Sequence, residues 1–348
     1  MVFSFYLYKY PYKFIWHIKN SFGKTIDFAF YCADPLDYEM FLPIAKYLPE
    51  FTVIARDSKT KKYLTEKGIK SVRMPAFPQV VIMARQTPYK FPVKEIIKFG
   101  FDHGLYQFKR WTSAENYNGF DMYFVSSSNQ VKIAESRGIK STKAIGYPKL
   151  DSAFNGEYNN QFLEKFKKLH NIDSNKKTII FTTTWNVAGL SAINKWVDKL
   201  EELTAKYNVL VTVHTWTEQK HIQKLNSTKD IIFINDYDVT PFLMISDLLI
   251  GDYSSIIGEF CAFNKPIITF EVPESDRTIP DIIKMIMDIS IQINSFDQLP
   301  KAIEESIANP NEKVEERRKA NKILFDDLDG KAGYRAANFI NEFLKSHS

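Results

Sequence analysis

The sequence lacks the residues and motifs that identify several common classes of protein. Two cysteines in 348 residues, Cys32 and Cys261, exclude a disulfide framework and a cysteine-rich zinc site. No stretch approaches the roughly 18 uncharged apolar residues that a transmembrane helix needs. The motifs GxGxxG, GxxxxGKS/T, GxSxG and HExxH do not occur. The sequence therefore offers no dinucleotide fingerprint, P-loop, hydrolase nucleophile elbow or zincin site.

What the sequence does contain is an ordinary globular composition with an uneven charge. Hydrophobic residues make up 45% and charged residues 25%, and the length suits about two domains. Residues 1–150 hold 23 Lys and Arg against 12 Asp and Glu, a charge of +11, whereas residues 151–348 carry −6. A basic half indicates an anionic partner. The basic residues are dispersed rather than clustered, so we expect no nucleic acid as that partner.

The first 22 residues combine aromatic side chains with lysines. Aromatics occupy positions 3, 5, 6, 8, 10, 12, 14 and 16, with Lys9, Lys13 and Lys19 among or just after them. This pattern is typical of a segment that lies on a membrane surface, and equally of a hydrophobic segment that packs on its own domain. The lysines interrupt the apolar run and no A-x-A site follows, so it does not read as a signal peptide. We therefore expect a cytoplasmic location.

Short apolar runs alternate with amphipathic stretches along the whole chain. Runs of Val, Ile and Phe suit strands of parallel sheets that are buried on both faces, and the alternation predicts an α/β fold. The pattern pauses after residue 146, which divides the chain into domains 1–150 and 151–310, followed by a helical tail, 311–348. The predicted strands are 26–32, 51–55, 80–84, 121–126, 178–184, 209–214, 230–235, 247–252 and 266–272. The predicted helices are 38–48, 59–67, 129–137, 158–170, 189–206, 216–225, 255–264 and 297–308.

Residues just after such strands are the ones to inspect, because ligands of doubly wound folds bind at the carboxyl ends of the strands. Asp252, Ser254 and Ser255 follow one predicted strand and precede a helix. Hydroxyls and free backbone N–H groups at a helix start favour a phosphate. An N-cap serine with a first-turn acid is the alternative. Glu259 lies one turn further, where it could accept a hydrogen bond from a ribose hydroxyl.

Two histidines also follow apolar runs, and a lysine lies at the boundary between the predicted domains. His103-Gly104 follows the run that ends in IIKFG, and His214 ends the strand 209–214. Histidine is the usual general base near neutral pH, although a lone histidine is more often structural. Lys149 lies at the domain boundary, where it could meet an anion or simply be a solvated linker residue.

One acidic pair also follows a strand. Asp236 and Asp238 form the D-x-D sequence Asp236-Tyr237-Asp238 after the strand 230–235. Some glycosyltransferases hold a metal–diphosphate with such a pair. Aspartates in turns more commonly cap the next helix.

In this order and spacing, the residues resemble the family of CDP-glycerol glycerophosphotransferases that build teichoic-acid and capsule polymers. The family's signatures are HG after an N-domain strand, G-x-P-R-x-D at the hinge, H-P after a C-domain strand, and a D-Y-S-S turn. The resemblance covers about residues 95–335 and includes the closing D-G-K-A segment at 329–332. In this chain the hinge arginine is replaced by Lys149, which lacks the bidentate grip of arginine on phosphate, and the proline is replaced by Thr215. The matching segments are His103-Gly104, Gly146-Tyr147-Pro148-Lys149-Leu150-Asp151, His214-Thr215 and Asp252-Tyr253-Ser254-Ser255.

The resemblance implies a GT-B architecture, in which two Rossmann-like domains face each other across a cleft and a C-terminal helix returns to the N-terminal domain. It implies a transferase that moves an alditol phosphate, glycerol phosphate in the first place, from a CDP-linked donor to a hydroxyl, with release of CMP. By this resemblance His103 is the general base. The substrate-binding residues would be Gly104, Lys149, His214, Asp238, Asp252, Ser254, Ser255 and Glu259, with the diphosphate held by Lys149, His214, Ser254 and Ser255.

The implied partners follow from the same resemblance and from the charge. They are a CDP-alditol donor, an anionic lipid-linked or polymeric glycan acceptor, and the inner face of the cell membrane. No cofactor is required on this interpretation, although Mg²⁺ assistance stays open. Three alternatives also remain open: a GT-B glycosyltransferase or sugar-nucleotide epimerase that uses a UDP- or CMP-sugar, a non-catalytic polyanion-binding protein, and a periplasmic-type ligand-binding protein.

Overall fold

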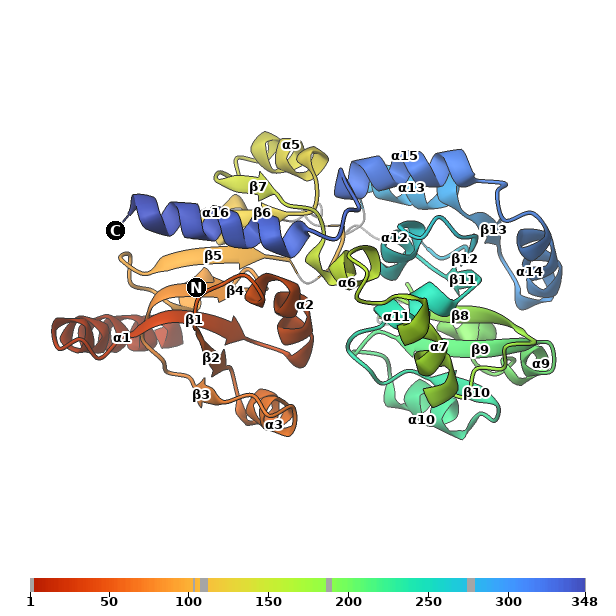
Figure 1. Cartoon of the computed structure of the whole chain (residues 1–348), viewed down its shortest axis with the longest axis horizontal. Helices are drawn as coiled ribbons and strands as arrows, with labels where there is room; N and C mark the ends of the chain where they lie inside the picture. The colour runs from red at the N-terminus through yellow and green to blue at the C-terminus, as the bar shows by residue number, and fades with distance from the viewer. Residues whose placement is uncertain (1–2, 103, 107–111, 186–189, 274–278, 348) are drawn as a thin grey trace. The chain divides into compact units, whose positions relative to one another are not determined.

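The computed structural model describes residues 3–102, 104–106, 112–185, 190–273 and 279–347, and it divides into two compact units (Figure 1). Unit 1 holds residues 3–102, 112–151 and 331–347. Unit 2 holds residues 104–106 and the described residues of 152–330. The tail predicted at 311–348 is therefore divided between the two units at Gly330.

Unit 1 is built on a seven-stranded sheet in the order β3-β2-β1-β4-β5-β6-β7, and every strand pair is parallel. At its centre Phe30 pairs with Val53 on one side and Ile82 on the other. The strands are β1 (Ile26–Cys32), β2 (Thr52–Ala55), β3 (Ser71–Arg73), β4 (Pro78–Met83), β5 (Ile97–Phe101), β6 (Met122–Val125) and β7 (Thr142–Ala144). The helices are α1 (Phe3–Ser21), α2 (Pro35–Ala45), α3 (Ser58–Glu66), η1 (Pro88–Lys90), α4 (Ala114–Asn118), α5 (Ser128–Ser136), η2 (Pro148–Leu150) and α16 (Ala332–Ser346).

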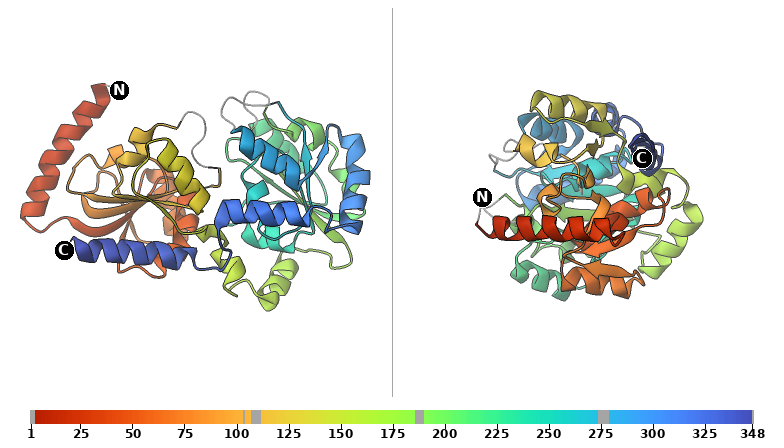
Figure 2. Two further views of the ribbon diagram at one scale, coloured as in Figure 1. Left: turned by 90° about the horizontal axis from the view of Figure 1, so that it is seen from above. Right: turned by 90° about the vertical axis from the view of Figure 1, so that its left-hand side faces the viewer.

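Helix α16 comes from the end of the chain yet belongs to unit 1 (Figures 1 and 2). Its Phe339 and Phe343 pack on Phe124 of β6 and Phe99 of β5. The carboxylate of Asp151 accepts hydrogen bonds from the first two backbone N–H groups of the helix, at 2.7 and 3.0 Å. The predicted return of a C-terminal helix to the N-terminal unit is thus confirmed. The last residue of the hinge motif is what caps that helix.

Unit 2 contains a second parallel sheet, with six strands in the order β10-β9-β8-β11-β12-β13. The strands are β8 (Lys177–Thr183), β9 (Tyr207–Val213), β10 (Ile231–Phe233), β11 (Leu248–Gly251), β12 (Ile267–Phe270) and β13 (Ile291–Ile293). The first helices are α6 (Asp151–Phe154), which joins the units, α7 (Asn160–Leu169), α8 (Ile193–Trp196), α9 (Glu201–Thr204) and α10 (Gln219–Ser227). The remaining ones are α11 (Thr240–Ile245), α12 (Ile256–Cys261), α13 (Pro280–Ile289), η4 (Phe296–Gln298), α14 (Leu299–Ala308) and α15 (Val314–Phe325).

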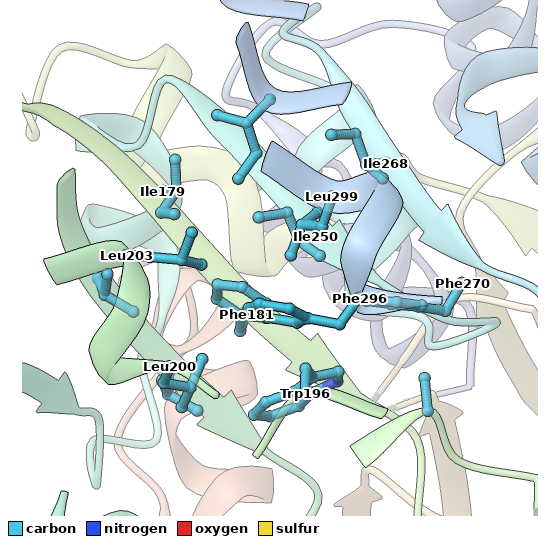
Figure 3. Packing of buried hydrophobic residues seen from close by; sticks show 14 of the residues in the cluster. Ile179, Phe181, Trp196, Leu200, Leu203, Ile250, Ile268, Phe270, Phe296 and Leu299 are labelled. Carbon is cyan, nitrogen blue, oxygen red and sulfur yellow. The ribbon is translucent and has the colours of Figure 1, made fainter. Parts of the chain in front are cut away.

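The core of unit 2 lies between its sheet and the helices that follow β8 and β13 (Figure 3). Trp196 packs on Phe181 at 5.1 Å between ring centroids, and Leu299 and Phe296 close the cluster. Both faces of the central strands are buried, which explains their uninterrupted apolar sequences.

The predicted α/β class is confirmed, and so is each of the nine predicted strands, within two residues at either end. The predicted strands do not include four of the observed ones: the five-residue β5, and β3, β7 and β13, which have three residues each. The single helix predicted over 189–206 is wrong, because its described part forms the separate four-residue helices α8 and α9. Among the described residues, no helix is both long enough and apolar enough to cross a bilayer.

Candidate functional site

The strand order of unit 2 reverses between β8 and β11, and this switch point is where doubly wound sheets bind ligands. Asp252 lies immediately after β11 and is fully buried. Its Oδ1 accepts from the Thr184 backbone N–H at 2.8 Å, and its Oδ2 accepts from Thr183 Oγ1 at 2.6 Å and the Ala192 N–H at 3.0 Å. The three donors belong to the last residue of β8 and to the segment that follows it. The carboxylate therefore ties the two loops of the switch point together.

Burial has an electrostatic effect on this carboxylate. It raises the pKa of Asp252 from 3.8 to about 6, and the hydrogen bonds from Thr183, Ala192, Thr184 and Ser254 oppose the rise only in part. Both oxygens are engaged inside the protein, so the structure gives Asp252 the role of orienting the turn.

The serines predicted to hold a phosphate lie at the start of α12. Ser254 Oγ accepts weakly from the Ile256 N–H at 3.4 Å, and Ser255 is the N-cap residue, whose side chain makes no capping hydrogen bond. Glu259 lies in the same helix and is buried. Gly104, also in unit 2, comes close to this turn, since a Cβ at that position would lie 3.7 Å from Ser255 Oγ.

The same segment of chain is anchored further into unit 2. Leu105 and Tyr106 are buried, and a Cβ on Gly258 of α12 would meet both, at 2.9 and 2.8 Å. A side chain at 258 would therefore force the ends of the Leu105 and Tyr106 side chains to shift. His103, the predicted general base, lies outside the described residues.

His214 follows β9, the strand next to β8, and is exposed. Its Nδ1 accepts from the Trp216 backbone N–H at 3.1 Å, and the Thr217 N–H donates to the His214 carbonyl at 2.9 Å, which closes a turn. The Trp216 ring lies 5.4 Å from both the His214 ring and the Trp185 ring, edge to face in each case. His214 was predicted from the sequence as a substrate-binding residue, whereas neither tryptophan was.

Asp238 is engaged locally. One oxygen accepts from Tyr158 Oη at 2.6 Å and the other from the Thr240 N–H at 3.0 Å, at the start of α11. The bond to the Thr240 N–H at the start of the helix fits the capping interpretation of the D-x-D sequence, which was the alternative to metal binding. Among the residues that the structure describes, no three His, Cys, Asp or Glu side chains group as metal ligands would.

Unit 1 has its own switch point between β1 and β4. Asp37, in the first turn of α2, is fully buried and receives two hydrogen bonds of 2.9 Å from Nε of Arg85, which follows β4. Next to this pair, Gln86 donates to Asp102 and, at 3.0 Å, to Tyr123 Oη. None of these contacts was predicted from the sequence. Lys149 lies in η2, in the hinge motif of unit 1, and is partly exposed.

Two units with doubly wound parallel sheets, and polar residues gathered at the switch point of each, define an α/β protein of the GT-B class. Residues 12–342 match the family model for CDP-Glycerol:Poly(glycerophosphate) glycerophosphotransferase, and the chain belongs to this family.

Curated relatives agree with that assignment. The teichoic acid ribitol-phosphate polymerase TarL of Staphylococcus aureus is 30% identical over 44% of this chain and 30% of its own length. The teichoic acid poly(ribitol-phosphate) polymerase of Bacillus spizizenii is 26% identical over 65% of this chain and 38% of its own length. The chain thus spans about a third of the length of these relatives.

Solved structures share the fold. An H444N variant of the wall teichoic acid polymerase TagF superposes with a TM-score of 0.71 at 16% identity, over 97% of this chain and 93% of that one. A complex of S. aureus MnaA with UDP gives a TM-score of 0.63 at 16% identity, over 92% and 97%. At this identity the likeness establishes the architecture.

Proposed function

We propose that this chain transfers an alditol phosphate, glycerol phosphate in the first place, from a CDP-linked donor to a hydroxyl of a membrane-linked glycan or polymer. The observation that carries the proposal is the family match over residues 12–342. Relatives named as primases and polymerases of both glycerol phosphate and ribitol phosphate support the class of donor.

The reaction is a phosphoryl transfer. The acceptor oxygen forms a bond to the phosphorus that carries the alditol, the bond from that phosphorus to the bridging oxygen breaks, and CMP leaves. The proton of the acceptor hydroxyl passes to His103 as general base. In such a reaction the protein acts mainly by positioning the groups and stabilising charge.

Within unit 2, the proposal assigns the diphosphate to the surface formed by the carboxyl ends of β11, β8 and β9. Ser254 and Ser255 supply hydroxyls after β11, and His214 supplies an imidazole after β9. Asp252 holds the loop that follows β8, the strand between β9 and β11. Glu259, Asp238 and Gly104 are proposed as contacts to the donor. Lys149 belongs to the hinge motif of unit 1, and it is proposed as a further diphosphate ligand on the family resemblance alone.

In this proposal these donors stabilise the negative charge on the transferred phosphate without a resident cofactor. Whether Mg²⁺ adds to that stabilisation is open. The acceptor is proposed to be anionic, either lipid-linked or polymeric, because residues 1–150 carry a charge of +11.

Helix α1 supports a membrane surface as the place of action. Its Tyr12 and Trp16 are buried against unit 1 and donate to the carbonyls of Ala76, at 2.6 Å, and Pro78, at 2.8 Å. In the right-hand view of Figure 2 the helix crosses one end of the unit 1 sheet. The aromatic segment thus packs on its own domain, which was one of the two interpretations of the sequence.

The opposite face of α1 is apolar and open to solvent. The exposed side chains there include Leu7, Tyr10, Phe14 and Ile18, and Phe14 is 68% exposed. Four lysines and no acidic residue occur in residues 1–26. An exposed apolar row with flanking lysines suits the interface of a bilayer that contains anionic lipid. We therefore propose that the protein is peripheral on the inner face of the cell membrane.

The test is nucleotide release from a panel of donors. We expect CMP from CDP-glycerol or CDP-ribitol in the presence of a phosphate-bearing acceptor, and no UDP from UDP-sugars. His103→Ala should lower turnover about 10²–10⁴-fold, whereas His347→Ala, beyond the end of α16, should leave it unchanged. Turnover of a UDP-sugar with none of any CDP-alditol would replace this proposal with a glycosyltransferase or epimerase.

A further inference from the structure

Unit 2 has a small recess at the edge of its sheet opposite the candidate site. The recess lies where β12 and β13 begin, at Ile267 and Ile291, and residues of α14 and of the start of α15 also line it (Figure 1). Its volume is about 220 Å³, including the open mouth. Sites for drug-sized molecules have roughly 300–1,000 Å³, so this recess is too small for a nucleotide and suits a single small ion.

One of the residues that line the recess is a buried arginine. Arg317, in α15, is 2% exposed. Its Nε donates to Asn264 Oδ1 at 3.1 Å and its Nη2 to the Pro310 carbonyl at 2.6 Å, so two of its five N–H donors have a partner among the described residues. No carboxylate in that part of the chain forms an ion pair with it, and Glu316 acts on it only through space. A charge buried without a counter-ion is costly.

Arg317 differs in this respect from the buried lysine of unit 1. Lys98 is 7% exposed, its Nζ donates to the carbonyls of Val93 and Ile96 at 2.9 and 2.6 Å, and burial lowers its pKa to about 8. A lysine can therefore reduce the cost of burial by losing its proton. Arginine stays charged in proteins, so the charge of Arg317 needs another form of compensation.

A second buried group in the recess also lacks a partner. Ser306, in α14, lines the same recess and is 2% exposed, and its Oγ makes no hydrogen bond to any residue that the structure describes. The recess lies beside the start of α15, where backbone N–H groups and the positive end of the helix dipole favour an anion. The N-cap residue, Lys313, makes no capping hydrogen bond with its side chain. A guanidinium, a hydroxyl and a helix start are all groups that can donate to an anion.

The charges around the recess indicate the valence of that anion. Arg317 and Lys313 contribute two positive charges and Glu312 one negative charge, which leaves a net charge of +1 on the residues that line it. Glu315 and Glu316 lie nearby in the first turn of α15 and add negative charge. A dianion would be repelled by these carboxylates more strongly than a monovalent ion. Charge and size therefore favour a small monovalent anion over phosphate.

We propose that this recess binds one small monovalent anion of the halide class through Arg317, Ser306 and the start of α15. The anion neutralises the buried guanidinium and gives the serine hydroxyl an acceptor, so it stabilises unit 2. This inference is independent of the proposed function, because the recess lies at the opposite edge of the sheet from the candidate site and its tests use no turnover.

The first test is thermal unfolding of the full chain in sodium gluconate, with chloride replacing gluconate at constant ionic strength. A ligand that binds only the folded state raises the unfolding midpoint by mass action. We expect a saturable rise of about 2–4 °C with chloride, which bromide reproduces and phosphate does not. The absence of a saturable rise with chloride overturns the proposal, and a saturable rise with phosphate alone overturns the choice of a monovalent anion.

The second test repeats the chloride titration on variants of the recess. Ser306→Ala should unfold in gluconate at or above the wild-type midpoint, because an unpaired buried hydroxyl is gone, yet its rise with chloride should be less than about half that of the wild type. Arg317→Gln removes the charge and should abolish the rise. Arg318→Gln is the matched control on the same helix, since Arg318 is 61% exposed and paired with Glu315, and it should keep the full rise. A full rise in Ser306→Ala overturns the proposal even where Arg317→Gln does not fold.

The third test locates the anion. Bromide is a halide that can be identified by its anomalous scattering, so crystals grown in sodium bromide should show an anomalous peak within hydrogen-bond distance of Arg317 Nη1 and Ser306 Oγ. A water molecule at that place, without anomalous signal, overturns the proposal. Bromide in the recess without a saturable effect in solution also overturns it, because the site then holds an adventitious ion only.

Discussion

Replacing Asp252 with asparagine tests whether its carboxylate holds the switch point of unit 2 together. Asparagine keeps the size of the side chain but exchanges one acceptor oxygen for an N–H donor. If the remaining oxygen keeps the Thr184 N–H, the new amide group faces the Ala192 N–H, which donates to Asp252 at 3.0 Å in the wild type. Two donors then meet in a buried place, and the backbone N–H of Ala192 loses its acceptor.

The magnitude follows from those contacts. A buried donor left without its acceptor costs about 1–3 kcal/mol, and hydrogen bonds to a charged group are worth more than neutral ones. We expect the free energy of unfolding of Asp252→Asn to fall by about 2–4 kcal/mol at pH 7.5.

The pH dependence is a sharper signature. The pKa of Asp252 is raised by burial to about 6 in the folded protein, above the unfolded value of 3.8. The folded state therefore binds the extra proton in this window, so the contribution of Asp252 to stability is full below pH 3.8 and is lost as the pH rises through 6. Between pH 5 and pH 7.5 the wild type loses about 1.5 kcal/mol from this group. Asparagine does not titrate, so the substitution should cost about 1.5 kcal/mol more at pH 5 than at pH 7.5.

The assay is urea unfolding at both pH values, followed by tryptophan fluorescence and far-UV circular dichroism. All other titrating groups are common to the wild type and the variant, so the difference isolates Asp252. Asp247→Asn is the matched control at the opposite end of β11, where the carboxylate accepts from the Thr178 N–H and Lys177 Nζ but is 35% exposed. We expect it to cost less than about 1 kcal/mol, because water replaces the lost contacts. An equal cost of Asp252→Asn at both pH values, or a cost no larger than that of the control, would refute the reasoning.

Two further predictions concern unit 1. Combining Leu7→Ser, Phe14→Ser and Ile18→Ser on the exposed face of α1 should weaken binding to vesicles that contain anionic lipid by about tenfold or more, with unchanged helix content and with Leu169→Ser as control; undiminished vesicle binding would reject the membrane role of that face. Gly333→Ala should lower the free energy of unfolding by about 1–3 kcal/mol, because its Cβ would lie 2.3 Å from the Pro43 carbonyl oxygen, where α16 meets α2; the exposed Tyr334→Ala on the same helix is the control, and equal stability of the two variants would contradict this packing.

The sequence patterns correctly predicted the elements whose hydrophobic pattern is local and regular. Strand β1 was predicted with its observed ends, because all of its seven residues except Asp27 are apolar or aromatic and the run lies between a turn and a helix cap. The three-residue strands β3, β7 and β13 have no period to detect, and two of the three residues of β3 are exposed. The break between α8 and α9 was missed because Trp196 and Leu200 are both buried, so the amphipathic pattern runs on across it.

In the candidate site, too, residues that are close in the sequence could be predicted, and contacts between distant residues could not. The Asp252–Ser255 turn could be found because its residues are consecutive and follow a buried strand. The pairing of Asp37 with Arg85 could not, since 48 residues separate them and neither belongs to a recognised motif. Asp238 was a candidate by its spacing, yet its carboxylate is engaged by Tyr158, 80 residues away in the sequence.

At each switch point a buried aspartate connects two loops, but the groups that compensate its charge differ. This difference affects how favourable each switch point is for an anion. In unit 1 the buried Asp37 is neutralised by Arg85, so the pair adds little net charge to the loops that it joins. In unit 2 the buried Asp252 is held by one hydroxyl and by the backbone N–H groups of Thr184, Ala192 and Ser254, and among the described residues no cation pairs with it as Arg85 does with Asp37. Under the proposed function, a negative charge on Asp252 above pH 6 would oppose a diphosphate at the neighbouring serines. The donors proposed to face the diphosphate would have to outweigh this repulsion. Under the proposed function, His214 after β9 is one such donor, and its short side chain would lose less conformational entropy on binding than a long flexible cationic side chain.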